Sequence, residues 1–139
     1  MSFLESRDMV VSTLSPVHIG CGEDFVPTEY VVDAKGSLHR FDPGALAALE
    51  DTIIMKDISA ALANHDAEKQ LHAVHAALQR HRERILPFAS VRIPMCVGVH
   101  SHYKLTQDVR NDFNRNGIER TAFSALDQSP YLPGSSLKG

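Results

Sequence analysis

The sequence predicts an α+β fold in one domain, with a block of helices set between strand-forming segments. Three observations favour this class. β-branched and apolar runs separated by turn residues fill the first 41 residues. The hydrophobic period becomes helical between residues 57 and 86. After Pro87 it returns to the alternation typical of a strand.

The N-terminal part is expected to hold a buried strand and a hairpin. Residues 9–15 are apolar and β-branched, which is typical of a buried strand. Residues 18–24 contain two glycines and read as a turn-rich loop in which positive φ or close backbone approach is possible. Residues 30–33 and 37–41 flank Ala34-Lys35-Gly36, which predicts a hairpin.

The helices begin where Asp42 precedes Pro43, an N-cap followed by proline at the first helical position, and the first is expected to end near Glu50. A pair of helices is predicted over residues 57–86. Its apolar stripe is expected in the core and consists of Leu71, Val74, Leu78 and Ile85.

Residues 91–97 predict a further strand, which Pro94 confines to a sheet edge or a bulge. Residues 107–117 are rich in Asn and Asp and predict a loop. Residues 118–126 predict another short strand.

Composition excludes several classes of protein. No apolar run approaches the roughly 20 residues that a membrane helix needs. The N-terminus carries Glu5 and Asp8 where a secretory signal has a basic patch. Cys21 and Cys96 are the only cysteines, so a disulfide scaffold or a zinc ribbon is excluded and a cytoplasmic protein is expected.

The net charge of −3 is unevenly distributed. Residues 1–79 hold five Lys/Arg and twelve Asp/Glu, a net charge of −7. Residues 80–139 hold nine Lys/Arg and five Asp/Glu, a net charge of +4. The basic C-terminal part is compatible with binding a phosphate backbone.

Residues 134–139 read Gly-Ser-Ser-Leu-Lys-Gly. At a strand-to-helix junction, such residues place backbone N–H groups, hydroxyls and a cation together, which suits a phosphate. A capped helix start with an exposed lysine is the simpler interpretation, and a P-loop would need a Lys-Ser/Thr that the sequence does not reach. Because a single turn cannot nucleate a helix, we expect the chain to be a fragment or a truncated reading frame of a longer protein.

Residues 130–139 resemble the glycine-rich signature of the RAMP proteins of type III CRISPR effector complexes. Residues 14–23, 27–33 and 38–42 are most similar to the type III-A (Csm) subunit at the 3′ end of the CRISPR RNA. The resemblance implies that residues 1–139 form a ferredoxin-like (RRM-like) RAMP domain with a helical insert at about 43–87, and that the family's C-terminal part is absent.

The resemblance also implies a non-catalytic subunit that binds single-stranded CRISPR RNA, caps its 3′ end and aids its maturation in antiviral defence. Other Csm-type subunits, especially the backbone RAMP, are the implied partners; no membrane, catalytic residue, cofactor or metal is implied. The implied RNA-binding residues belong to two loops: His18, Gly20 and Gly22, and Gly134, Ser135, Ser136, Lys138 and Gly139. A packed or capping role for His18 is the alternative.

Two rival functions remain open. A RAMP endoribonuclease would use a loop acid, Asp24 or Asp33, with a divalent metal, or His100 and His102 as acid and base. The two histidines would then alternate onto one face of an extended segment. A pure interaction module that docks on other subunits would touch no RNA.

Histidines also gather in the predicted helices. His65, Glu68, His72 and His75 fall on one helical stripe, at spacings that suit zinc or a di-metal centre. Because no second set of ligands is recognisable, we expect a solvated flank. The helical segment is expected to pack on a neighbouring subunit.

Overall fold

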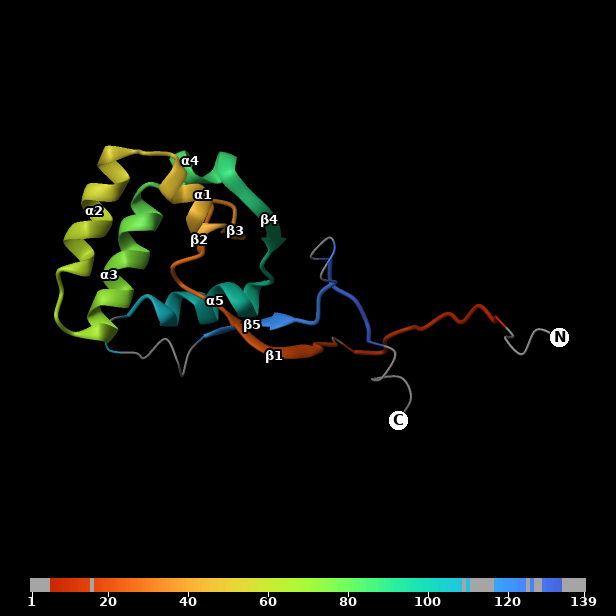
Figure 1. Cartoon of the computed structure of the whole chain (residues 1–139). Helices are drawn as coiled ribbons and strands as arrows, with labels where there is room; N and C mark the ends of the chain where they lie inside the picture. The colour runs from red at the N-terminus through yellow and green to blue at the C-terminus, as the bar shows by residue number, and fades with distance from the viewer. Residues whose placement is uncertain are drawn as a thin grey trace.

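The computed structural model describes residues 6–15, 17–108, 110, 117–124, 126 and 129–133. Within these residues the chain forms two small antiparallel sheets, with the helices α1–α4 between the strands β3 and β4 (Figure 1). The prediction of an α+β fold is confirmed.

The larger sheet has the order β2-β3-β4, with strands Tyr30–Val32, Ser37–Phe41 and Ala89–Pro94. The predicted hairpin joins β2 to β3. The Asp33 carboxylate accepts the backbone N–H groups of Lys35 and Ser37, and Gly36 takes φ +79°. The Ser37 N–H and the His39 imidazole hold the pKa of Asp33 down at about 2.

Four helices connect β3 to β4: α1 (Pro43–Ala48), α2 (Thr52–Leu62), α3 (Ala67–Arg80) and α4 (Arg82–Ile85), followed by the 3-10 turn η1 (Leu86–Phe88). Asp42, Asp51 and Asp66 cap the first three helices by accepting backbone N–H groups. The predicted start at Asp42 is confirmed. The next helix begins five residues before residue 57 because Asp51 caps it.

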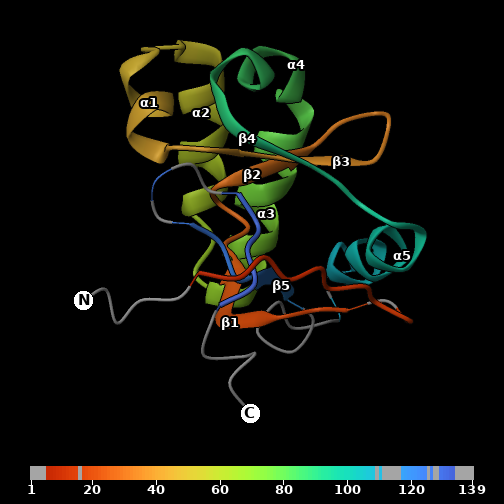
Figure 2. The ribbon, with the colours of Figure 1, turned by 90° about the vertical axis from the view of Figure 1, so that its right-hand side faces the viewer.

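These helices cover one face of the larger sheet and bury a first core (Figure 2). Of the predicted stripe, Val74, Leu78 and Ile85 are buried, whereas Leu71 is half-buried. They pack with Val31, Phe41, Leu46 and Ile54.

The outer edge of β2 is covered by a side chain. The Gln79 amide accepts the Val32 N–H at 2.9 Å and donates to the Val32 carbonyl at 2.5 Å. This pair of bonds imitates a neighbouring strand and satisfies an otherwise open sheet edge.

The opposite face of the larger sheet packs on α5 (Val97–Thr106) and on a ribbon of β1 (Gly20–Phe25) and β5 (Ile118–Thr121) (Figures 1 and 2). This second core contains Tyr30, Val32, Leu38, Tyr103 and Ile118.

Two boundaries differ from the prediction. Residues 20–25 form a strand rather than a loop, because they pair with β5 across an irregularity at which Gly22 takes φ +76°. The predicted strand at 91–97 ends at Pro94, and Val97 opens α5. Its alternation and its edge position in the sheet are confirmed.

The predicted buried strand at residues 9–15 is wrong. Val10 is 94% exposed and Leu14 fully exposed, and neither described sheet includes this segment. It runs away from the body of the molecule (Figure 1). A segment of β-branched and apolar residues becomes a strand only where another strand pairs with its backbone N–H and C=O groups. No strand among the described residues pairs with residues 9–15.

Candidate nucleic-acid interface

A groove of about 580 Å³ lies between β4 of the larger sheet and the β1–β5 ribbon. Its floor is largely apolar and includes Leu38, Val91, Ile93, Met95 and Ile118. Three basic side chains also line it: His18, Arg40 and Arg120.

The two arginines come from two different strands. Arg40 lies on β3 with one N–H group 3.4 Å from a Glu29 oxygen. Arg92 on β4 contributes to the wall of the groove, but it stands opposite His39 and donates to the Ser37 hydroxyl at 3.3 Å, so its side chain lies on the other face of the sheet. Sequence reasoning did not single out Arg40 or Arg120. The sequence does show an arginine within a predicted strand, and the alternation of side chains along a strand places such an arginine on a defined face of the sheet.

Arg120 on β5 is held by stacking. Its guanidinium carbon lies 3.8 Å from the centre of the Phe123 ring and 5.3 Å from the centre of the Phe25 ring. The side chain is 12% exposed, and its Nη1 lies 3.0 Å from a Glu23 oxygen. The rings therefore fix the plane of this cation independently of its acidic partner.

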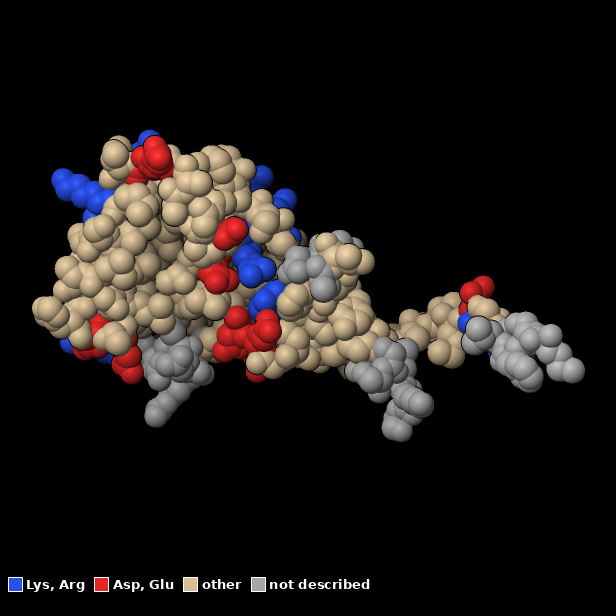
Figure 3. Space-filling view, in the orientation of Figure 1, with Lys and Arg blue, Asp and Glu red and all other residues tan. Residues whose placement is uncertain are grey.

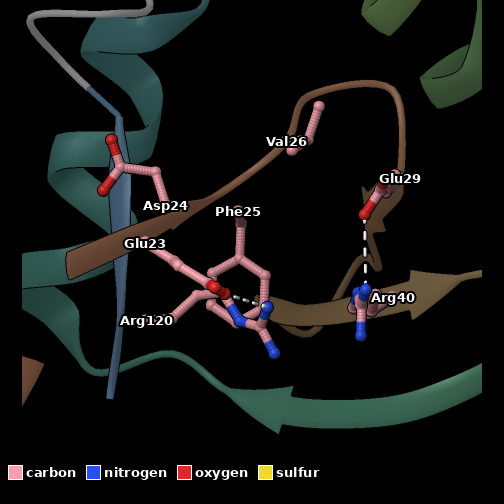
Figure 4. Close-up of a pocket in the computed structure, with 7 residues that line it drawn as sticks. All are labelled: Glu23, Asp24, Phe25, Val26, Glu29, Arg40 and Arg120. Carbon is pink, nitrogen blue, oxygen red and sulfur yellow. Dashed lines mark hydrogen bonds and ion pairs between the residues drawn. The ribbon is translucent and has the colours of Figure 1, made fainter. Parts of the chain in front are cut away.

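A second hollow, of about 480 Å³, shares Arg40 and Arg120 with the groove. Figure 4 shows Glu23 directed at Arg120 and Glu29 at Arg40, while Asp24 points away from both. On the face drawn in Figure 3, acidic and basic side chains lie side by side, and the helical part of that face is largely uncharged. The groove arginines thus border a row of carboxylates.

Of the first predicted RNA-binding loop, the structure places His18 at this groove, with Nε2 3.3 Å from a Glu119 oxygen, whereas Gly20 and Gly22 do not line it. Gly20 is paired with Thr121 inside the ribbon, and a Cβ there would make only an ordinary contact. A Cβ at Gly22 would meet nothing within 4 Å, so the positive φ is what requires glycine there.

Ala122 links the two predicted motif regions. Its N–H donates to the Ile19 carbonyl at 2.6 Å, and its carbonyl accepts the Tyr131 N–H at 3.1 Å. Phe123 forms a β-bridge with Pro130 next to it. The chain that enters the glycine-rich motif therefore runs beside the segment that contains His18. Gly134, Ser135, Ser136, Lys138 and Gly139 themselves lie outside the described residues.

The expectation of a solvated flank holds for half of the histidine stripe. His65, which precedes α3, and Glu68 are exposed, whereas His72 is 6% exposed and His75 is fully buried. His75 Nδ1 donates to the Pro27 carbonyl at 2.7 Å, so its Nε2 accepts the Tyr103 hydroxyl at 3.0 Å. Burial lowers the pKa of His75 and raises that of Tyr103 to about 12.

The expected alignment of His100 and His102 is also wrong, because both lie on helix α5, where residues two apart face different directions. His102 Nε2 lies 3.2 Å from the Gly117 carbonyl. Of the two candidate acids, Asp33 is engaged in the hairpin turn and Asp24 is exposed on β1.

Among the described residues, no three His, Cys, Asp or Glu side chains come together in a way that suits a metal ion. No helix in the described part of the chain is long and apolar enough to cross a membrane.

Comparison with known proteins gives one match. Neither the curated proteins nor the solved structures include a match to this chain. The family model described as the RAMP superfamily matches residues 10–139. This match extends the resemblance of the two motif regions to nearly the whole sequence. Membership of this family points to a CRISPR-associated role in binding RNA. The chain belongs to the RAMP superfamily.

Proposed function

We propose that this chain binds single-stranded CRISPR RNA by its sugar–phosphate backbone, along the groove between β4 and the β1–β5 ribbon. One observation carries the proposal: Arg40 and Arg120 reach this single groove from two strands that belong to different sheets, next to the segment that contains His18. Family membership supplies the class of ligand.

The chemistry of the groove suits backbone contacts. A guanidinium presents paired N–H donors that match phosphate oxygens, and such contacts carry no sequence information. The rings of Phe25 and Phe123 are both stacked against Arg120, which leaves less aromatic surface for bases. A subunit that must accept any guide sequence needs contacts to the RNA backbone rather than to the bases.

The finer proposal is a type III-A (Csm) subunit at the 3′ end of the CRISPR RNA, with a ferredoxin-like RAMP domain over residues 1–139. In this role Ser135, Ser136 and Lys138 join the groove in holding phosphates, and the backbone RAMP is the neighbouring subunit. The protein acts in the cytoplasm, caps the complex and aids maturation of the RNA without cutting it. The similarity of residues 14–23 and 130–139 to that subunit supports these assignments.

The test is binding of a labelled single-stranded oligouridine, measured by fluorescence anisotropy at about 50 and 200 mM salt with magnesium present. We expect salt-sensitive binding that Lys138→Ala weakens, with the RNA left intact. Cleavage that EDTA abolishes would assign the protein to the endoribonucleases instead. Absence of binding by this chain would contradict the proposal and favour a module that only contacts other subunits.

A further inference from the structure

The three basic side chains that line the groove are each paired with a carboxylate of the same chain. Arg120 pairs with Glu23 at 3.0 Å, Arg40 with Glu29 at 3.4 Å, and His18 lies 3.3 Å from Glu119.

The carboxylates occupy donor positions that a phosphate would use. The Glu23 side chain is 60% exposed whereas that of Arg120 is 12% exposed, so solvent reaches the acid more readily than the base. Because two rings hold the guanidinium, a phosphate oxygen can replace the Glu23 oxygen without displacing Arg120. Glu29 and Arg40 are both 30% exposed and open into the same hollow (Figure 4).

We infer that Glu23 and Glu29 act as internal competitors of RNA, so that RNA binding exchanges each carboxylate for a phosphate on Arg120 and Arg40. This inference rests on the proposed function and assigns a form of regulation to the same site. A single phosphate ion gains little from one exchange. A continuous RNA strand makes several exchanges at once, and the second and later ones are effectively intramolecular. The groove therefore selects a polyanionic strand over mononucleotides.

The test compares Glu23→Gln, Glu29→Gln and the double variant with the unsubstituted chain, using the same labelled oligouridine. Exposed ion pairs are modest, so each single variant should bind about two- to five-fold more tightly. In the unsubstituted chain a glutamate that RNA frees becomes exposed and attracts a cation, which offsets part of the counterion release. Without that glutamate, log K should fall more steeply with log salt. Inorganic phosphate and uridine monophosphate should compete with the oligouridine more effectively for the double variant than for the unsubstituted chain.

Two matched variants separate local exchange from a general change in charge. Asp24→Asn removes a carboxylate from the same hollow that is paired with neither arginine. Glu68→Gln removes an exposed one at the start of α3. Both should raise the affinity less than Glu29→Gln does. Thermal melting of each variant checks that the fold is kept.

The possible outcomes distinguish the proposed competition by carboxylates from RNA binding itself. If the unsubstituted chain binds RNA but Glu23→Gln and Glu29→Gln bind no more tightly than Asp24→Asn, the competition is overturned while RNA binding stands. If neither the unsubstituted chain nor the double variant binds RNA, the proposed function fails, and the inference fails with it. Binding by the double variant alone would contradict the proposed function, because the unsubstituted chain must bind RNA, and the inference would fail with it.

Discussion

The two faces of the larger sheet differ in what their charges do. On the face covered by α1–α4, Val31, Ile54 and Ile85 are essentially inaccessible to water, and aspartates serve to cap helices. On the other face a groove stays open, and charged side chains from β3 and β5 line it. The first face supplies stability, and the second leaves its basic groups where a ligand can reach them.

Two adjacent isoleucines on α2 give the largest expected contrast. Ile54 is 1% exposed in the first core and Ile53 is 54% exposed. Ile54→Ala should lower the free energy of unfolding by about 2–5 kcal/mol, whereas Ile53→Ala should change it by about 0.5 kcal/mol or less. Urea denaturation measures both. Equal losses would mean that α2 does not pack as described.

Removal of the Gln79 side chain from the edge of β2 is expected to give the next largest loss of stability. Gln79→Ala leaves the Val32 N–H and carbonyl without their partners and should cost about 1–3 kcal/mol of unfolding free energy. Gln70→Ala on the same helix removes an exposed bond to the Leu62 carbonyl and serves as control. A loss at Gln70 as large as that at Gln79 would refute the edge-covering role.

Acid should weaken the junction between the two faces. Burial lowers the pKa of His75 in the folded state below the value of about 6.5 expected when the chain is unfolded. The unfolded chain therefore binds more protons as the pH falls below that value, so the contribution of His75 is present above it and is lost below it.

The loss should reach at most about 1.4 kcal/mol per pH unit for one proton. Urea denaturation between pH 5 and 8, a range of about three units around the usual His pKa, measures it. His75→Gln keeps a donor and an acceptor and should flatten this dependence. An unchanged slope in that variant would assign the effect to another group.

The smallest expected effect is on RNA binding, and it compares a cation in the groove with a cation on the helical side. Arg40→Ala in the groove should weaken binding a few-fold and reduce the steepness with which log K falls with log salt. Lys69→Ala removes an exposed cation from α3 and should leave the slope unchanged. Titration of labelled oligouridine at several salt concentrations measures the slopes. Equal slopes for the two variants would indicate that RNA does not choose between the faces.

Local signals predicted the helical side well. Asp42-Pro43, the turn at Asp33 and the stripe of Val74, Leu78 and Ile85 act through neighbours close in sequence. The groove depends on partners far apart, such as Glu23 and Arg120, which are 97 residues distant. Sequence periodicity does not show such pairings. For the same reason the sequence predicts a loop at residues 18–24 and a solvated His75, and the structure corrects both.

The most direct test of the account is the site of cross-linking to RNA. Single-stranded RNA that contains 4-thiouridine is bound, irradiated and digested, and the cross-linked peptides are identified by mass spectrometry. Cross-links should fall in β4, residues 89–94, and in residues 117–124 around β5, which line the groove. Cross-links confined to the helices of residues 43–85 would contradict the claim that the open face binds RNA.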